Sequence, residues 1–575
     1  MTEAAARRAE ARRARRAEAR ADARAKALTP LQAGVARRHR AHRTPSRPPA
    51  FRQLCFPRVF KVQNQQAFLG EHLGPGGGGR GVLAFHVLGA GKTCAAIRVA
   101  EAWRGKGRRA VVVLPASLVG NFYRELAGGC GPRGRGVAPK DDPHYTVMSV
   151  NRFVKLARES PSAVAALLRG AVLIVDEVQN VVSETGANYK AFEAAIAAAP
   201  ADLRVVLLSA TPIFDKPVEL ALTLNLLRPA TPFPVGREFE RTFLEERKGV
   251  VVMRDVELFR RMAAGLVSFF PGAPPAAFPR ASSTVVRCPM SAYQYASYLA
   301  VEEREGRARG GAQFRDMRGM PNDFLIGSRT VSNVAFPERA AGRAGLELFR
   351  GAAALGPRGL ARHSCKMAAL LERLDGCAGT AFVYSNFRGV AGLETLARAL
   401  EHRGFRAFPG VAGHPTYATW TGADASEARE AALAAFNDPA NAGGSRVKVM
   451  LASPAGKEGL NLLRCAQVHL LDPYWNTSRE EQVVGRAVRF CSHKDVPGKA
   501  RKVDVFRYLA VAPVRPGGAA AGERRKKKMT ADEHIHDMAR AKHALVVSFY
   551  RALREAAVDR GLFQRGAGLQ PPAAS

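Results

Sequence analysis

The stretch "HVLGAGKT", residues 86–93, is the first segment whose residue types suggest a chemical function. It ends in the Gly-Lys-Thr of phosphate-binding loops. The usual pattern is G-x-x-x-x-G-K-[ST], and here His86 stands at its first position. Backbone N–H groups of such a turn, together with the start of the following helix, bind phosphate oxygens. We therefore expect Lys92 to reach the β- and γ-phosphates of a nucleotide and the Thr93 hydroxyl to ligate Mg²⁺. The expected nucleotide-binding residues of this phosphate loop are Gly89, Ala90, Gly91, Lys92 and Thr93.

An acidic pair follows a later aliphatic run. "AVLIVDEVQN" places Asp176 and Glu177 directly after the run. We expect Asp176 to hold the Mg²⁺ and Glu177 to polarise the attacking water. An Asp-Glu pair in this position also occurs at an ordinary helix N-terminus. The pair and the phosphate loop together favour the nucleotide interpretation.

A third set of candidates lies near the end of the chain, in "EQVVGRAVRFCSH". Gln482, Arg486 and Arg489 recur at spacings of four and three, which places them on one face of a predicted helix. Alone, this pattern predicts no more than a solvated charged face. Opposite a phosphate loop, the arginines would stabilise charge that develops on the γ-phosphate. We count all three residues as catalytic candidates, with Lys92 and the acidic pair.

Two further polar loops each follow an aliphatic run. "SATP", residues 209–212, suits a hinge that senses the γ-phosphate, and "ASPAGKEGLN", residues 452–461, suits contact with a sugar-phosphate backbone or with the nucleotide. Neither pattern is specific by itself.

Two series of short aliphatic runs must position these loops. Helix-like segments separate the runs, and this βαβ rhythm predicts parallel sheets covered on both faces. Such sheets bind ligands beyond the carboxyl ends of their strands, where each run carries its polar residues. The first series is "GVLAFHV", "RRAVVVL", "AVLIVD" and "LRVVLLS", and the second is "TAFVY", "RVKVMLAS", "AQVHLLD" and "KVDVFRYLAV".

The predicted fold class is α/β, with two sheet domains in tandem. Residues 1–48 are rich in Ala and Arg and almost free of large apolar side chains, so we predict a disordered basic arm that either contacts phosphates or is merely solvated. The first sheet domain is predicted at 49–235, a mostly helical insertion at 236–360 and the second sheet domain at 361–512. A basic loop and a C-terminal amphipathic helix are predicted at 513–575.

The charge balance points to a polyanionic partner. The 575 residues include 87 Lys and Arg against 50 Asp and Glu, a formal net charge of +37. GC-rich codons could have inflated arginine, but they do not explain the shortage of acidic residues. We therefore expect nucleic acid as the partner.

The eight cysteines are scattered and have no zinc-binding spacing, so we expect free thiols in a reducing compartment. No apolar run approaches the ~20 residues of a membrane span. The N-terminus lacks the apolar region of a secretory signal. We expect no membrane partner and an intracellular location.

Taken in order, the motifs resemble those of superfamily 2 helicases and translocases. The matching segments are "QNQQAFL", "LPASL", "DEVQ", "SATP", "VYSNF", "KEGLN" and "QVVGRAVR". The resemblance implies two RecA-like P-loop domains with the site between them, and ATP and Mg²⁺ as cofactors. It implies adenine recognition by Gln66 and a nucleotide contact at Gly459.

A closer resemblance is to the Swi/Snf-like ATPases of large DNA viruses, a group that includes the poxviral nucleoside triphosphate phosphohydrolase I. It rests on segments such as "SATPIFDKPVELALTLNLL", "GLVSFFPG", "VHLLDPYWN" and "AAVDRGLF", and it extends from about Phe51 to Phe563. Swi/Snf-type loops commonly lack glycine at the position of His86. Relatives often have glycine at Val87 and cysteine at Arg560, so this chain departs from them there.

This resemblance implies an ATP-dependent motor that steps along double-stranded DNA in viral transcription, with the viral RNA polymerase as a partner. It also implies a location in the host cytoplasm, in the nucleus or in the virion. One alternative is a helicase that separates DNA or RNA strands, and another is a nucleic-acid-binding scaffold with a degenerate ATPase. Tyr474 and Trp475 are candidates for base stacking, but we favour packing beneath the arginine segment, residues 482–489.

Overall fold

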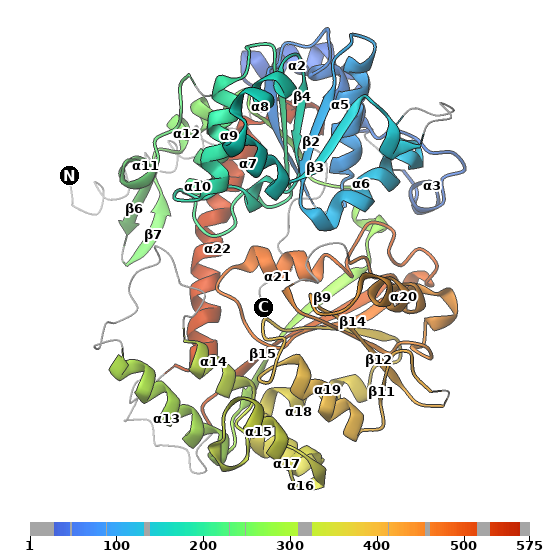
Figure 1. Ribbon diagram of the computed structural model, residues 1–575, viewed down its shortest axis with the longest axis vertical. Helices are drawn as coiled ribbons and strands as arrows, with labels where there is room; N and C mark the ends of the chain where they lie inside the picture. The colour runs from blue at the N-terminus through green and yellow to red at the C-terminus, as the bar shows by residue number, and fades with distance from the viewer. Residues whose placement is uncertain are drawn as a thin grey trace, which may run out of the picture.

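Two parallel sheets, one above the other in Figure 1, organise the computed structural model of this protein. We call the upper sheet with its helices lobe 1 and the lower sheet with its helices lobe 2. The structure describes residues 28–45, 49–87, 89–131, 138–228, 230–247, 249–308, 325–411, 413–454, 460–513 and 529–563.

The sheet of lobe 1 has six parallel strands in the order β3-β2-β4-β5-β1-β8. The side chains of β1, β2 and β4 are buried on both faces, as their aliphatic sequences predict. The strands are β1 (Gly81–His86), β2 (Ala110–Leu114), β3 (Tyr145–Ser149), β4 (Val172–Val175), β5 (Arg204–Ser209) and β8 (Val267–Phe270).

Alternate residues of these strands face two separate cores in lobe 1. Val112 and Ile174 face α4 (Asn64–His72), α5 (Lys92–Arg104) and α6 (Val119–Glu125). Val113 and Leu173 face the opposite set of helices. That set comprises α7 (Val150–Glu159), α8 (Pro161–Leu168), α9 (Ala187–Ala198), α10 (Val218–Asn225), α11 (Gly236–Phe243) and α12 (Val256–Ala263).

The sheet of lobe 2 has seven parallel strands in the order β11-β12-β13-β10-β14-β15-β9. They are β9 (Arg280–Pro289), β10 (Thr380–Tyr384), β11 (Arg406–Ala407), β12 (Thr416–Trp420), β13 (Val449–Ala452), β14 (Cys465–Leu470) and β15 (Lys502–Val511). One face packs against α13 (Ala292–Ala308), α15 (Gly342–Leu348), α16 (Gly351–Leu355), α17 (Pro357–His363), α18 (Cys365–Asp375) and α19 (Leu393–His402). The other packs against α20 (Ser426–Asn437) and α21 (Thr477–Val484). The α/β fold with two parallel-sheet domains is therefore confirmed.

The segment 236–360 differs from the predicted helical insertion. It supplies α14 (Ile326–Asn333) and a hairpin of β6 (Leu244–Arg247) and β7 (Val250–Met253), but also one edge strand to each main sheet. β8 pairs with β1 in lobe 1, and β9 pairs with β15 in lobe 2. The chain therefore crosses between the lobes just after Phe270, and this segment belongs to both of them.

The N-terminal segment also differs from its prediction. Within the predicted disordered arm, α2 (Pro30–Arg38) begins with a capping box between Thr29 and Gln32, and it buries Val35 and Ala36. This local capping signal was present in the sequence. Residues 1–27 and 46–48 of that arm lie outside the described residues.

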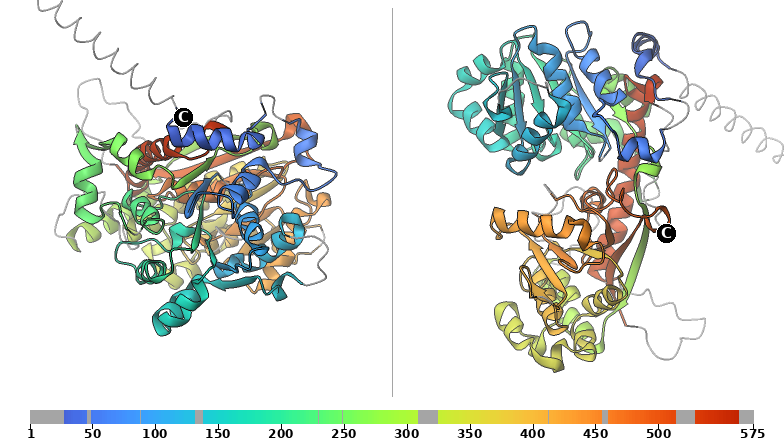
Figure 2. Two further views of the ribbon diagram at one scale, coloured as in Figure 1. Left: turned by 90° about the horizontal axis from the view of Figure 1, so that it is seen from above. Right: turned by 90° about the vertical axis from the view of Figure 1, so that its right-hand side faces the viewer.

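The predicted C-terminal helix is α22 (Ala531–Ala556), with 26 residues. Its first turns, with Ala531 and Ile535, pack in the core of lobe 2. Its last turns, with Phe549 and Leu553, pack in the core of lobe 1. Figure 2 shows this helix, in red, running along one side of the molecule from one lobe to the other. The short α23 (Arg560–Phe563) follows it, whereas the predicted basic loop at 514–528 lies outside the described residues.

Two disulfides contradict the expectation that all thiols are free. Cys55 pairs with Cys491 and Cys94 with Cys130, at Cα–Cα distances of 5.4 and 5.2 Å. Both pairs form through tertiary contacts that cysteine spacing does not reveal. The other four cysteines are free and buried. Among the described residues, no helix combines the length and the apolar content needed to cross a membrane.

Candidate active site

The phosphate loop connects β1 to α5 at the carboxyl edge of the sheet of lobe 1. Gly89 and Gly91 have φ values of 78° and 71°, which is the left-handed region that favours glycine. Gly91 is the N-cap of α5, so Lys92 and Thr93 begin the helix. This places the backbone N–H groups of the first helical turn at the loop, as the sequence predicted.

Helix α4 holds the loop from the side. Gln65 Nε2 donates to the carbonyl of Ala90 at 3.0 Å, and Gln66 Nε2 donates to the carbonyl of Gly91 at 3.2 Å. A Cβ on Gly91 would lie 2.4 Å from Gln66 Nε2 and would displace the end of that side chain, while the positive φ of Gly91 is what favours glycine there. Gln66 therefore contacts the loop backbone, and its role in adenine recognition stays a prediction.

His86, the unusual first residue of the loop, is fully buried. Its Nε2 lies 3.0 Å from Ser268 Oγ on β8, and that hydroxyl donates to Asp559. Asp559 also accepts from the N–H of Phe269 at 2.9 Å. Burial lowers the pKa of His86 to about 3, and Lys92 adds to the effect, so the imidazole is neutral. The C-terminal segment "AAVDRGLF" thus anchors the strand beneath the phosphate loop.

Asp176 and Glu177 follow β4 at the same edge of the sheet. Burial is the main cause that raises the pKa of Asp176, and the negative charge of Glu177 raises it further. The positive charge of Lys92 acts in the opposite direction. Glu177 has φ 50° and ψ 50°, a left-handed conformation that residues other than glycine rarely adopt. Such outliers concentrate at functional sites, where the surrounding structure holds them in place.

A chain of hydrogen bonds runs from Glu177 to lobe 2. Gln179 Nε2 donates to Glu177 Oε2 at 2.5 Å, and Ser209 Oγ donates to Gln179 Oε1 at 2.7 Å. Ser209 Oγ accepts from the N–H of Thr211 at 3.0 Å. Gln482 Nε2, from lobe 2, donates to Thr211 Oγ1 at 3.0 Å. The "SATP" segment therefore links the acidic pair to the arginine segment.

The predicted single helical face for the arginine segment is wrong. Helix α21 ends at Val484, and Gly485 is its C-cap, so only Gln482 is helical while Arg486 and Arg489 lie in the turns that follow. The turns nevertheless reach the phosphate loop, because a Cβ on Gly89 would lie 3.5 Å from the backbone nitrogen of Phe490. The structure thus brings the phosphate loop and the arginine segment into contact.

Sequence analysis missed Glu125, the last residue of α6. Burial raises its pKa, although Asn121 donates to it at 3.3 Å and the positive charges of Arg489 and Lys92 act against the rise. Glu125 also contributes to the raised pKa of Asp176. No spacing in the sequence marks this glutamate, because its neighbours come from distant segments and from both lobes.

Two other predictions concern lobe 2. Gly459 lies outside the described residues, so its nucleotide contact stays a prediction. Tyr474 and Trp475 are only 6% and 5% exposed, with ring centroids 3.9 Å apart, and the guanidinium of Arg479 on α21 lies 4.2 Å from the Tyr474 ring. Both rings are therefore buried, and their packing beneath the arginine segment itself stays a prediction.

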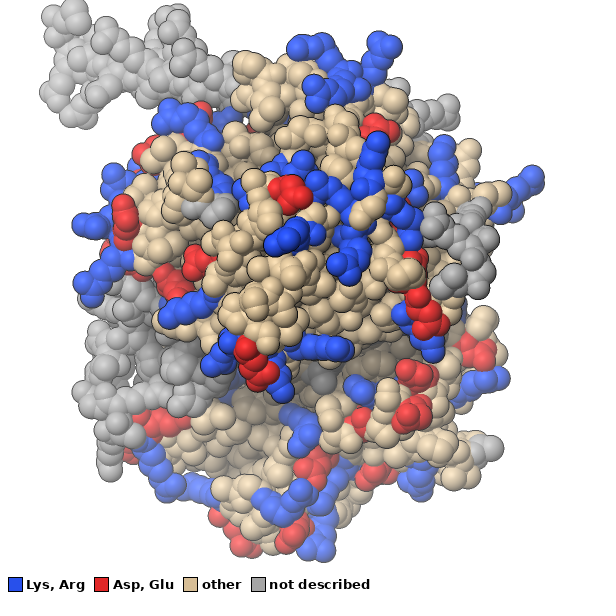
Figure 3. All heavy atoms as spheres, turned by 45° about the horizontal axis from the view of Figure 1, so that its top comes forward, with Lys and Arg blue, Asp and Glu red and all other residues tan. Residues whose placement is uncertain are grey.

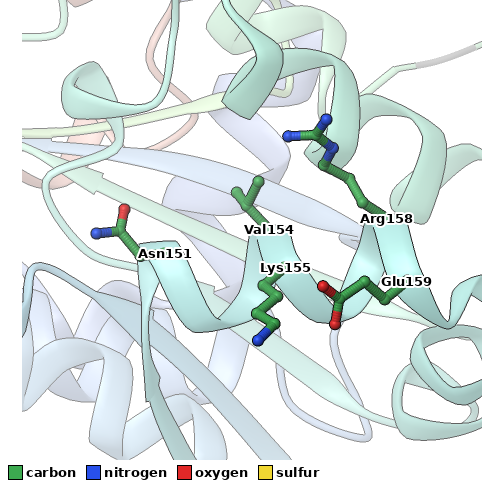
Figure 4. A pocket seen from close by; sticks show the side chains of 5 residues that line it. All are labelled: Asn151, Val154, Lys155, Arg158 and Glu159. Atoms are coloured by element: carbon green, nitrogen blue, oxygen red, sulfur yellow. The ribbon is translucent and has the colours of Figure 1, made fainter.

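The surface of the molecule has two concave regions. Figure 3 shows a hollow between the two halves of the molecule, with Lys and Arg side chains along its rim. Figure 4 shows a separate pocket of about 550 Å³ on α7, lined by Asn151, Val154, Lys155, Arg158 and Glu159. None of these residues belongs to the predicted nucleotide site.

Comparisons with known proteins show similarity to viral helicases. Residues 367–491 match the helicase conserved C-terminal domain, which runs from α18 through the arginine segment. The chain is 36% identical to a protein of Acanthamoeba polyphaga mimivirus named as a candidate ATP-dependent RNA helicase, over 92% of this chain and 94% of that protein. It is 25% identical to the termination factor NPH-I homolog of African swine fever virus, over 85% of this chain and 77% of that protein.

Proposed function

The chain belongs to the superfamily 2 helicases of large DNA viruses, related to the poxviral nucleoside triphosphate phosphohydrolase I, and from this premise we propose that it is an ATP-driven translocase on double-stranded DNA. Membership makes it a nucleic-acid-dependent ATPase. The choice of duplex DNA, the stepping without strand separation and the role in transcription are the proposal.

The observation that carries the proposal is the hydrogen-bonded chain from Glu177 to Gln482. It joins the residue expected to act on the attacking water to the segment of lobe 2 that carries the arginines. A change at the γ-phosphate would therefore alter contacts between the lobes. Motion of one lobe relative to the other is what stepping along a polymer requires.

Each lobe would supply a different part of the hydrolysis. Lys92 would neutralise charge on the β- and γ-phosphates, and Glu177 would orient water and accept its proton. Arg486 and Arg489 would stabilise charge that develops in the transition state, and such arginines contribute about 10³–10⁵ in rate. Because the arginines lie in lobe 2, hydrolysis would be fast only while the lobes are closed.

The site fits Mg²⁺, which Thr93 and Asp176 would hold. The raised pKa of Asp176 indicates a buried carboxylate with too little positive charge around it, and Glu125 adds negative charge nearby. An ion held by Thr93 and Asp176 would supply that positive charge beside the phosphates. From the chain itself, the positive charge of Lys92 would act on both the phosphates and Asp176.

The arrangement of 236–360 supports translocation without strand separation. In the part of the chain that the structure describes, this segment is the one sizeable candidate for a strand-splitting wedge, and its described parts divide between the two sheets and the surrounding helices. Unwinding must break stacking of about 1.4 kcal/mol per base-pair step, which requires an element that inserts between strands. No separate domain of that kind occurs among the described residues.

Hydrolysis of radiolabelled ATP, with and without nucleic acid, tests the enzymatic part. We expect duplex DNA to stimulate the wild type strongly, and Lys92→Ala to remain folded but inactive. Stimulation by RNA and not by duplex DNA would contradict the proposal that duplex DNA is the substrate. It would favour the RNA helicase alternative, which agrees with the names of the mimivirus relatives. An inactive wild type would favour the scaffold hypothesis.

Two strand-displacement assays separate tracking from unwinding. Release of a triplex-forming strand from duplex DNA reports tracking, and release of an annealed strand from a tailed duplex reports unwinding. We expect ATP-dependent release in the first and little in the second. Strong release in the second, lost in Lys92→Ala, would make this chain a strand-separating helicase.

The role in viral transcription rests on the relatives. The African swine fever virus relative is named a termination factor. We propose that this chain acts on the viral RNA polymerase at duplex DNA, in transcript release or elongation, in the host cytoplasm, the nucleus or the virion. ATP-dependent release of RNA from a stalled complex of that polymerase would support the role. Equal release by Lys92→Ala would contradict it.

A further inference from the structure

A cluster of potential metal ligands lies where the N-terminal segment meets α4. His39 follows α2, His42 ends the short helix Arg40–His42, and Glu71 lies in the last turn of α4. Each residue offers one ligand atom, and the three atoms lie within 4.8 Å of one another. We propose that His39, His42 and Glu71 bind a transition-metal ion, with Zn²⁺ as the best match.

The distances fit one shared ion. His39 Nδ1 lies 3.3 Å and His42 Nε2 lies 2.8 Å from the two carboxylate oxygens of Glu71. Zinc bonds to nitrogen and oxygen of about 2.0–2.2 Å in a tetrahedron keep neighbouring ligand atoms about 3.3 Å apart. The three ligand atoms lie within 4.8 Å of one another, so side-chain movements of up to about 1.5 Å would bring them to this spacing, and water would fill the fourth position.

The hydrogen bonds of the cluster are incomplete. His42 Nε2 approaches the carboxylate closely, yet it has no partner with hydrogen-bond geometry. A buried polar atom without a partner is costly, so His–Glu hydrogen bonds alone do not account for this arrangement. A cation between His42 and Glu71 would satisfy both groups.

The charge of a neighbouring arginine bears on the choice of ion. Arg38 is a nearby positive charge. Its positive charge would repel cations that the site holds weakly. The site would therefore favour ions that bond strongly to imidazole nitrogen.

The site would join two parts of lobe 1. Residues 28–45 supply both histidines, and α4 supplies the carboxylate at one end while its Gln65 and Gln66 hold the phosphate loop at the other. An ion at the cluster would therefore fix the N-terminal segment to the helix that supports the loop. An ion that binds only the folded state also raises its stability.

Metal content of the untagged full-length protein tests the proposal. The protein is treated with N-ethylmaleimide to block accessible thiols, incubated with Zn²⁺ and dialysed before elemental analysis. We expect one zinc per chain in the wild type. His42→Ala, at a half-buried position, and Glu71→Gln, at an exposed one, should retain less than a tenth of it while keeping wild-type ATPase activity. The matched control His402→Ala removes an exposed histidine of α19 and should retain full zinc.

Two results would overturn the site. One is wild-type zinc content after dialysis that is near zero, or equal to that of His42→Ala and Glu71→Gln. The other comes from Co²⁺ in place of Zn²⁺: nitrogen and oxygen ligands give visible d–d bands alone, whereas an intense thiolate charge-transfer band would assign the metal to cysteines. We expect the d–d bands in the wild type and their loss in both variants.

Discussion

Glu177 combines an unfavourable backbone conformation with a hydrogen bond to Gln179 that fixes its carboxylate. Backbone strain of this kind costs of order 1–3 kcal/mol and persists only where neighbouring structure imposes it. The strain places Glu177 beside the phosphate loop, at the start of the chain of hydrogen bonds to lobe 2. A residue held so firmly is suited to orient one water molecule.

We therefore predict that Glu177→Gln binds ATP normally but hydrolyses it about 10²–10⁴ times more slowly, because it loses the base and keeps the size. Equilibrium binding and single-turnover hydrolysis measure the two effects. Glu159→Gln, on the exposed face of α7, is the control and should match the wild type. Turnover by Glu177→Gln close to the wild-type rate would mean that Gln179 or Gln482 orients the water.

Asp559 gives a prediction for the pH dependence of stability. Burial raises its pKa to about 7, against about 3.9 in an unfolded chain. At pH values between about 3.9 and 7, Asp559 keeps its proton in the folded state and has released it in the unfolded state. The contribution of Asp559 to stability is therefore present at low pH and is lost as pH rises towards 7 and above.

Asp559→Asn cannot ionise and keeps an acceptor for the N–H of Phe269. We predict that its melting temperature, relative to the wild type, increases as pH rises from 5 to 8, by the equivalent of about 2.7 kcal/mol at most. Other buried carboxyls occur in both proteins, so their effects cancel in the difference. A constant difference over this range would contradict the buried, protonated carboxyl.

Local spacing predicted some site residues and could not predict others. Lys92, Asp176 and Glu177 were found because each lies in a short motif after an aliphatic strand. Glu125 and the contact between His86 and Asp559 depend on segments far apart in the chain, and no short motif encodes them. The arginines were placed on a helix because their spacing fits one, although the chain leaves the helix at Gly485.

At the scale of elements, α22 makes polar contacts with both lobes at its centre. Lys542 Nζ lies 3.0 Å from Asp215 Oδ1, just beyond the "SATP" segment. The neighbouring His543 shares a 2.8 Å hydrogen bond with Thr477, the first residue of α21. The helix therefore contacts the segment that follows Thr211 in lobe 1 and the helix that carries Gln482 in lobe 2. A displacement of either segment can be transmitted to the other through α22.

We predict that Lys542 and Asp215 are energetically coupled by about 1–3 kcal/mol, because the pair is largely removed from water. A double-mutant cycle with Lys542→Met and Asp215→Asn, measured by denaturant unfolding, gives the coupling. The exposed pair Arg446 and Asp438 is the control, and its coupling should stay below about 1 kcal/mol. Equal coupling energies for the two pairs would contradict the role assigned to Lys542.

The strands that the sequence predicted all lie inside the sheets, each between two neighbouring strands. Those it missed include β3, β8, β9 and β11, which are the four edge strands. An interior strand is buried on both faces and appears as a continuous aliphatic run. An edge strand such as β9 is largely exposed and polar, so its sequence carries little signal.

At the scale of the whole molecule, the disulfide between Cys55 and Cys491 fixes α3 (Phe51–Cys55) to lobe 2. The guanidinium of Arg501 also lies 3.6 Å from the ring of Phe51. The chain then returns to lobe 1 at Asn64, the first residue of α4. The segment 51–64 therefore connects the lobes beside the arginine segment.

We predict that reduction with dithiothreitol raises DNA-stimulated ATPase activity severalfold, because lobes without this covalent tie can separate more freely in each cycle. Cys491→Ser should have the higher activity with or without reductant. Cys130→Ser opens the disulfide within lobe 1 and should still respond to the reductant. An identical response to dithiothreitol in Cys491→Ser and the wild type would exclude this explanation.

The basic arm gives a second prediction at this scale. Because α2 is folded, the deletion that tests the arm should end at residue 27 rather than 48. We predict that this deletion weakens DNA binding and flattens its salt dependence, by about 0.9 in the log–log slope for each phosphate that the arm neutralises in the wild type. Binding titrations over a series of salt concentrations measure the slope. An unchanged slope would favour the codon explanation for the arginines of the arm.

The packing of α22 has a consequence for how the ribosome delivers this protein. The strands of lobe 1 are nearly all made by residue 209, but Phe549 and Leu553 complete one of its cores and Leu562 and Phe563 the other. At 5–20 residues per second, roughly 15 to 70 s of synthesis separate the strands from these side chains. During that time the parts of the two cores of lobe 1 that these side chains cover remain open. The half of the molecule that is translated first is therefore finished last, and the nascent chain is a natural client for chaperones.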